Sequence, residues 1–180
     1  MRNNVIMTLD LLKNESKKIA RLSGNRDLNE KIVKAKMKSL EQYGQLMPAV
    51  VVDATDAINQ GLEVVDFVTG NVVGKEEAVN YLVLVDANHR YEAHCRLLKE
   101  NEKLDEPKYM GEFYLMYALN TELEIAKMLS EINISTNPWK GGDYAKGAKM
   151  SNLKRELPLL DAINDLVNEG YNLSVASKWL

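Results

Sequence analysis

The strongest chemical signal in the sequence is a short polar box that follows an apolar run and is made of Asp86, Asn88, His89 and Arg90. The apolar run, residues 81–85, predicts a buried strand, and residues 88–101 have the spacing of a helix. The start of a helix presents unpaired backbone N–H groups and the positive end of the helix dipole, and both attract anions. An arginine at that place adds a forked donor suited to phosphate or carboxylate. The box therefore predicts an anion site.

A second segment is expected to border the same site. Residues 43–52 indicate the end of a helix, a turn at Gly44 and, from Pro48 onward, an apolar strand of the kind that is buried on both faces. This strand and the one that ends at the polar box are both expected in the core of the fold. Two strands would then lie beside one pocket.

Less specific interpretations of these residues stay open. Arg90 is also placed to pair with a neighbouring carboxylate such as Asp86, an interaction that needs no ligand. His89 and His94, with Cys95 beside the second, suggest a metal site, but their spacing puts the histidines on different faces of a helix and the chain has one cysteine. We therefore expect no metal site here, and we expect Cys95 to be a small core residue.

Residues 135–150 form the least regular segment of the sequence and are interpreted as a loop. Trp139 and Lys140, followed by two glycines, have the composition of a lid that closes over a ligand; the alternative is that Trp139 packs at the edge of the core. Three acidic residues near the motifs are candidates for Mg²⁺ binding or for a base, with solvent-exposed surface as the alternative: Glu41, Asp53 and Glu131.

The remaining pattern interleaves helices and strands along the chain. Helices are predicted at residues 27–43 with Asp27 as N-cap, 88–101, 121–133 with Thr121 and Glu124 as capping residues, 157–169 and 174–180. Strands are predicted at residues 48–53, 81–85 and 109–119, and residues 55–80 are expected to hold further strands and turns. Residues 5–12 are apolar and predict a short strand or the first turn of a helix. Residues 14–27 are a charged run in which no strand or helix is predicted.

The chain of 180 residues is long enough for one sizeable core. Its net charge of −3 argues against a domain coated in basic residues for non-specific DNA binding, although its 23 lysine and arginine residues can still be clustered. One cysteine excludes an internal disulfide framework, and the sequence has neither a signal-peptide pattern nor the ~20-residue apolar stretch of a membrane span. We expect a cytoplasmic protein without membrane contact.

The motifs resemble those of the superfamily that contains the ParB N-terminal domain and sulfiredoxin. In that superfamily a helix ending in the pattern S-I-x-x-x-G-x-x-x-P-I-x-V leads to the first core strand, and the matching residues here are Ser39, Leu40, Gly44, Pro48, Val50 and Val52. A second strand ends in a box of the type D-G-x-H-R-x-x-A, matched by Asp86, Ala87, His89, Arg90 and Ala93. Ala87 stands where the family has glycine. The resemblance covers residues 22–148.

The resemblance implies further residues of a phosphate site. Family members carry an E-N-x-x-R segment, and this chain has Asn133 with Thr136 in the place of the arginine, so one positive charge of the family's site is missing. Asn88 occupies the position of the reactive cysteine of sulfiredoxin-like proteins, which argues against sulfiredoxin chemistry. The nucleotide site expected from the polar box and the resemblance together consists of Asp86, Asn88, His89, Arg90, Gly44, Pro48, Asn133 and Thr136.

The expected fold is α/β, a ParB/sulfiredoxin-like mixed sheet with flanking helices over residues 1–148. A helical segment follows over residues 149–180 and resembles the start of a helix-turn-helix. The resemblance implies a nucleotide-responsive DNA-binding protein of the ParB-like type that serves plasmid, phage or mobile-element maintenance or regulation. It also implies CTP or ATP with Mg²⁺ as ligand, DNA as a partner of the full-length protein, and a homodimer. The alternative is a nucleotide-using enzyme of the same superfamily, a kinase, a nucleoside triphosphate hydrolase or a nuclease-like protein.

Overall fold

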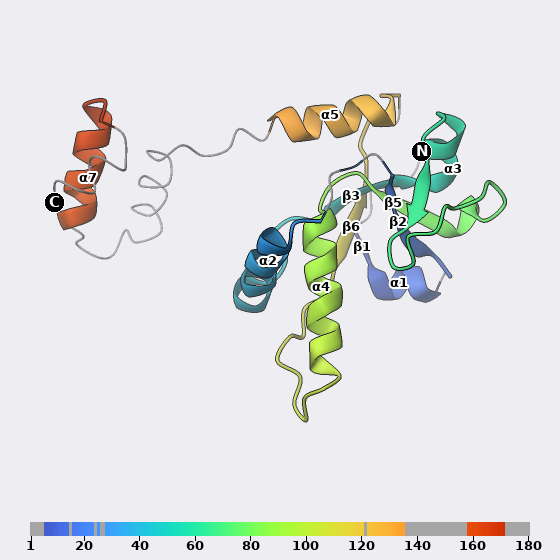
Figure 1. The fold of residues 1–180 in the computed structure, drawn as a ribbon, viewed down its shortest axis with the longest axis horizontal. Helices are drawn as coiled ribbons and strands as arrows, with labels where there is room; N and C mark the ends of the chain where they lie inside the picture. Colours follow the sequence, from blue (N-terminus) through green and yellow to red (C-terminus); the bar gives the residue numbers. More distant parts are fainter. Residues whose placement is uncertain are drawn as a thin grey trace. The chain divides into compact units, whose positions relative to one another are not determined.

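The computed structural model of the chain describes residues 6–14, 16–23, 25, 28–120, 122–135 and 158–171, which Figure 1 shows as a ribbon. The chain divides into two units, Met1–Asn133 and Ile134–Leu180, and each is described by itself. The first unit holds a six-stranded mixed sheet with flanking helices, so the predicted α/β fold class is confirmed. The domain boundary expected after residue 148 stays a prediction, because residues 136–157 lie outside the described part.

The sheet has the strand order β1–β6–β3–β5–β2–β4, which places β3 and β5 in its middle. β2 runs parallel to β5 and β3 runs parallel to β6, whereas the other neighbours are antiparallel. In the register, Val83 of β5 lies between Val52 of β3 and Ala20 of β2. The strands are β1 Met7–Thr8, β2 Lys18–Leu22, β3 Ala49–Asp53, β4 Val64–Asp66, β5 Tyr81–Leu84 and β6 Tyr114–Tyr117.

The helices of the described residues flank this sheet, apart from the last one, which belongs to the second unit. None of them is long and apolar enough to cross a membrane. The predicted helix at residues 157–169 is present as α7, and the one predicted at residues 174–180 lies outside the described part. The helices are α1 Leu9–Asn14, α2 Glu30–Tyr43, α3 Ala54–Asn59, the 3-10 turn η1 Ala78–Asn80, α4 Asn88–Asn101, α5 Ile125–Ser135 and α7 Pro158–Asn168.

Successive side chains of the middle strands point to opposite faces of the sheet and build two separate cores. In β5, Val83 joins the core under α3 and α5, whereas Leu82 and Leu84 join the core under α1 and α4. Each fully buried leucine contributes about 1.5–3 kcal/mol. Because a one-residue slip would exchange the two faces, the end of β5 has a fixed position in the sheet. The polar box that follows β5 therefore starts from a fixed point.

The helix α2 lies beside α4 (Figure 1), and the two share a third core made of Val33, Met37, Leu40, Ala93, Leu97 and Tyr109. The N-cap of α2 is Asn29 and not the predicted Asp27, because the Asn29 side-chain oxygen accepts hydrogen bonds from the N–H groups of Lys31 and Ile32. Gly44 ends the helix with a φ of 67°, as predicted. α2 thereby depends on α4 for its position.

The prediction of a charged run at residues 14–27 is wrong in its middle, where Lys18–Leu22 forms β2. The apolar residues of this strand are too few and too closely flanked by charges to show a strand period. Its stabilisation comes from segments far away in the sequence, since it pairs with both β5 and β4. The Lys18 amine also lies 5.6 Å from the centre of the Tyr81 ring.

Three further boundaries differ from the sequence prediction. Residues 55–80 contain α3 and η1 in addition to the single strand β4. β6 is shorter than the predicted strand at residues 109–119, because Tyr109 is buried beside His94 and its backbone is bound by the Asn101 side chain. α5 begins at Ile125, whose N–H group donates to Oε1 of Gln60 at 2.8 Å, and not at the predicted residue 121.

Asp66, the last residue of β4, organises the turn that follows the strand. Its Oδ1 accepts hydrogen bonds from the N–H groups of Val68 at 2.9 Å and Thr69 at 2.8 Å, and its Oδ2 accepts one from the Tyr81 hydroxyl at 3.0 Å. Burial disfavours the charged form, but these hydrogen bonds outweigh burial and lower the pKa of Asp66. The carboxylate thereby couples β4 to the first residue of β5.

Asp66→Ala should lower the free energy of unfolding by about 2 kcal/mol near neutral pH, because three donors lose their shared acceptor. Since the folded-state pKa is lowered, this contribution is complete above the ordinary value of 3.8 and disappears as the pH falls through the folded-state pKa. Urea unfolding of both proteins from neutral pH down to about pH 2 measures the difference. A difference that stays constant over that range would contradict the role of the charged form.

Candidate functional site

The link between β5 and α4 consists of Val85, Asp86 and Ala87, so the chain changes direction abruptly there. Ala87 has a φ of 67° and a ψ of 17°, which is the left-handed region. Glycine adopts this conformation readily, whereas the Cβ of any other residue crowds the backbone. The turn therefore has the backbone conformation that glycine adopts easily, and with alanine at position 87 this backbone is strained.

The Asp86 carboxylate ties this turn to the beginning of β3. Its Oδ1 accepts a hydrogen bond from the Val50 N–H group at 2.7 Å, and its Oδ2 accepts one from Nη2 of Arg90 at 3.1 Å. Arg90 in turn donates through Nη1 to the Met47 carbonyl at 2.7 Å. Pro48 lies between the two bonded residues of this segment, so the structure brings the two predicted motifs together. Arg90 pairs with Asp86, as the alternative interpretation expected.

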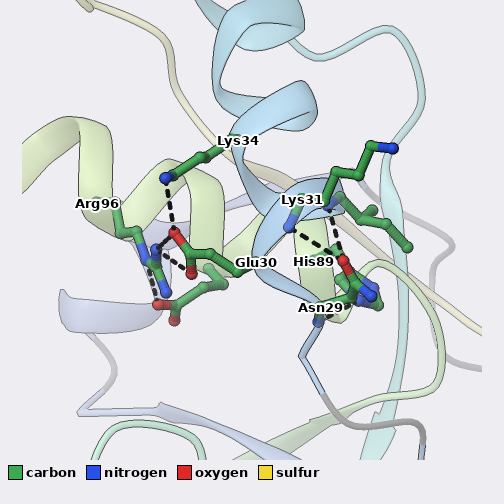
Figure 2. Close-up of polar contacts among 8 residues, drawn as sticks. Asn29, Glu30, Lys31, Lys34, His89 and Arg96 are labelled. Carbon is green, nitrogen blue, oxygen red and sulfur yellow. Dashed lines mark hydrogen bonds and ion pairs between the residues drawn. The ribbon is translucent and has the colours of Figure 1, made fainter.

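His89 links the same turn to the beginning of α2. Its Nε2 accepts a hydrogen bond from the Asn29 N–H group at 3.0 Å (Figure 2). With Nε2 as acceptor, the ring proton of a neutral His89 is on Nδ1. Because Asn29 is the N-cap of α2, the polar box and the first turn of α2 are held in a fixed relation.

A second contact between α4 and α2 joins Arg96 of α4 to Glu30, the first residue of α2 (Figure 2). Arg96 donates to Glu92 at 2.7 Å within α4 and, through Nη1, to both oxygens of Glu30 in α2 at 2.8 and 2.7 Å. The hydrogen bond from Arg96 lowers the pKa of Glu30. Nζ of Lys34 lies 3.8 Å from Oε1 of Glu30. This arginine is therefore occupied by carboxylates, and sequence analysis did not single it out because its Glu30 partner lies in another helix.

Two features of the first turn of α4 bear on ligand binding. They are the N-cap position at Ala87 and the buried side-chain amide of Asn88. Ala87, the N-cap residue of α4, offers no side-chain acceptor to the first turn of the helix, and the helix dipole favours an anion there. Asn88 is 7% exposed, and its Oδ1 has no hydrogen-bond partner among the described residues. Leaving such a buried atom unpaired costs about 1–3 kcal/mol. Because this oxygen has almost no solvent-accessible surface, a ligand donor would reach it only after the turn moved, and such a contact would recover that free energy.

The loop between α2 and β3 is held by a residue that sequence analysis missed. Gln45 donates through Nε2 to the Tyr114 carbonyl at 3.0 Å and accepts through Oε1 from the Tyr114 N–H group at 2.6 Å. The amide thus acts as a short extension of the sheet beside β6. Nothing in the local sequence indicates this role, because the partner is far along the chain. Gly44, which begins the loop, donates its N–H group to the Leu40 carbonyl.

Other predicted site residues are not brought to the turn by any described contact. Asn133 lies in α5, and its side chain is outside the described part. Thr136 and the predicted lid residues, Trp139 and Lys140, also lie outside the described residues. These four assignments stay predictions.

The acidic candidates for Mg²⁺ do not gather at the turn. Glu41 and Glu131 are exposed, and Asp53 accepts a hydrogen bond from the Tyr117 hydroxyl at 3.1 Å. Within the described residues, no group of three or more histidine, cysteine, aspartate and glutamate side chains is placed to hold a metal ion.

The second histidine belongs to the core. His94 is 3% exposed, and its Nδ1 lies 3.0 Å from the Tyr109 hydroxyl. It also packs against Phe113, with ring centres 5.2 Å apart. His89 and His94 therefore contact different parts of the protein.

Two hollows lie elsewhere in the first unit. One of about 290 Å³ lies between α3, the start of α5 and the ends of β3 and β6, with Asp56, Asn59 and Gln60 on its lining. Another of about 400 Å³ borders His94 and Tyr109. Neither hollow is lined by residues of the turn at 86–90, and what makes the turn a candidate site is its hydrogen-bond donors and its charge.

Ala87→Gly should raise the free energy of unfolding by about 0.5–1 kcal/mol, because glycine relieves the left-handed strain and this gain exceeds its greater chain entropy in the unfolded state. Ala93→Gly, in the buried middle of α4, is the matched control and should destabilise. Chemical denaturation of the three proteins gives both values. Destabilisation by both substitutions would show that Ala87 carries no strain.

No family model and no curated protein matches this sequence. Among solved structures, the chain is similar to the C-terminally truncated chromosome-partitioning protein ParB from Caulobacter crescentus complexed with CTP-gamma-S. The two chains are 11% identical with a TM-score of 0.50, and the similarity covers 86% of this chain and 66% of that chain. This chain therefore spans about two thirds of that protein. The similarity shows that the fold is ParB-like, and the finer assignment to a superfamily shared with sulfiredoxin stays a prediction.

Proposed function

We propose that the chain binds a nucleoside triphosphate at the Asp86–Arg90 turn and that the bound nucleotide controls attachment to DNA. The observation that carries the proposal is the composition of this turn. It joins Arg90, a helix start whose N-cap residue offers no side-chain acceptor, and the buried Asn88 amide oxygen, which has no partner among the described residues. Phosphate oxygens match the N–H donors, and a hydroxyl or amino group of a nucleotide matches Asn88.

CTP is the first nucleotide to test, because the ParB structure of similar fold contains CTP-gamma-S. ATP is the second, each with and without Mg²⁺. Gly44, Pro48, Asn133 and Thr136 belong to the proposed site through the family resemblance, and Trp139 with Lys140 belongs to its proposed lid. The missing arginine at Thr136 makes Arg90 the main positive side chain of the proposed site.

The DNA part of the proposal is supported by the ParB-like fold and by the role of the similar protein in chromosome partitioning. The same resemblance is the basis for proposing a role in plasmid, phage or mobile-element maintenance and for proposing a homodimer. In the second unit, α7 is the helix that would begin a helix-turn-helix module. The nucleotide would then shift the protein between two states on DNA.

The alternative, a nucleotide-using enzyme, is favoured by the D-x-x-H-R type of the polar box but not by the contacts of His89. His89 would be its natural base, but Nε2 of His89 already accepts the Asn29 N–H group. Release of inorganic phosphate or labelling of the protein during the binding experiments would favour the enzyme.

Arg90→Ala should weaken nucleotide binding by about 1.5–3 kcal/mol, the usual contribution of a hydrogen bond to a charged group. Isothermal titration calorimetry with CTP and with ATP measures this. Arg96→Ala is the matched control, because Arg96 lies in the same helix but is bound to Glu30 and Glu92. Equal affinity of wild type and Arg90→Ala, or an equal loss in both variants, would rule out a phosphate contact by Arg90.

Asp86→Asn should strengthen binding of the metal-free nucleotide by about tenfold, because a negative charge 3.1 Å from Arg90 repels the incoming phosphates. Asparagine keeps an oxygen for the Val50 N–H group, but its amide nitrogen cannot accept from Arg90, so the link to β3 is kept while Arg90 loses this partner. Calorimetry in the presence of a chelator isolates this effect. Weaker binding by the variant, with an unchanged melting temperature, would mean that Asp86 itself contacts the ligand.

A further inference from the structure

The helix α2 uses only one side of its surface to pack. Val33 and Leu40 are buried against α4, and Met37 lies in the same core. The four lysines of α2 lie on the remaining surface and are all exposed. That surface is therefore available to a partner.

Three of these lysines form one row along the helix. Lys31, Lys34 and Lys38 occupy positions i, i+3 and i+7, which lie on the same side of a helix. The row spans about 10 Å along the helix axis. Lys36 lies on a different side. We refer to Lys31, Lys34 and Lys38 as the basic row.

Two exposed carboxylates border the basic row, Glu30 at its start and Glu41 three residues beyond Lys38. Glu30 lies next to it, but Arg96 binds both oxygens of Glu30 at 2.8 and 2.7 Å, closer than Lys34 at 3.8 Å. Figure 2 shows the Lys31 side chain directed away from this cluster. Lys31 and Lys38 form no ion pair within the described part of the chain. Arg96 thereby reduces the carboxylate charge at the start of the row, and Glu41 remains as a carboxylate at its end.

We propose that the basic row is a contact surface for the phosphate backbone of duplex DNA. The chain carries a net charge of −3, so a nucleic acid would approach it where basic side chains are grouped, and the basic row is one such group. Lysines offer point charges to phosphates and read no bases, so this contact is independent of sequence and adds to any specific one. The inference rests on the DNA part of the proposed function and does not require that the turn bind a nucleotide.

The test compares two triple variants of the full chain with the same charge. K31Q/K34Q/K38Q removes the basic row, and K99Q/K103Q/K108Q removes three exposed lysines from the far end of α4 and the loop that follows it. Both take the formal net charge from −3 to −6. Binding of a fluorescent duplex of about 30 base pairs is titrated between about 20 and 200 mM NaCl, and the slope of log K against log salt gives the number of phosphates contacted.

Loss of the basic row should reduce the magnitude of this slope by about 2.7, which is three contacts at about 0.9 each, and the control variant should keep the wild-type slope. Equal slopes in the two variants would overturn the inference, because net charge alone would then explain binding. Absence of DNA binding by the wild-type chain at every salt concentration would overturn the inference and the DNA part of the proposed function together. Nucleotide binding, measured by calorimetry, stands or fails separately. Circular dichroism confirms that each variant is folded.

Discussion

The structure around the candidate site depends on the Asp86 carboxylate. One oxygen holds the N–H group of Val50 at the start of β3, and the other holds Arg90 in the first turn of α4. A central strand, a tight turn and a helix are thereby joined by one side chain that is about a quarter exposed. Low exposure strengthens such charged hydrogen bonds, because water competes less for the same groups. The same contact positions Arg90 and partly neutralises it, so the fold and the binding chemistry are linked.

The polar box contacts the start of α2 and the loop that follows this helix. His89 accepts the N–H group of Asn29 where the helix begins, and Arg90 donates to the Met47 carbonyl beyond its end. A phosphate that recruits Arg90 under the proposed function competes directly with the Met47 carbonyl. The proposed DNA surface lies on α2. The contacts that hold the start of α2 and the loop after it are made by His89 and Arg90, which belong to the proposed nucleotide site. This arrangement provides a physical route by which a nucleotide can influence DNA contact.

Two locally unfavourable features coincide at the turn. Ala87 has a left-handed backbone conformation, and Asn88 buries an amide oxygen without a partner in the described residues. Each costs on the order of 1 kcal/mol or more, and the buried strand β5 before them supplies the stabilisation that maintains both. Local rules are broken in this way mainly where a protein binds or reacts. The coincidence is the reason for placing the ligand here and not in the hollow under α5.

The sequence by itself determined the elements whose signal is local. The apolar run of β5, the helix of residues 88–101 and the glycine stop of α2 all follow from periodicity and backbone preference within a few residues. It also indicated that Arg90 either pairs with Asp86 or binds an anion. Only the tertiary structure decided β2, because its short charged segment becomes a strand through pairing with β5 and β4. The contacts of His89, Arg90 and Gln45 were likewise decided only by the fold, since each joins groups that are far apart in the chain.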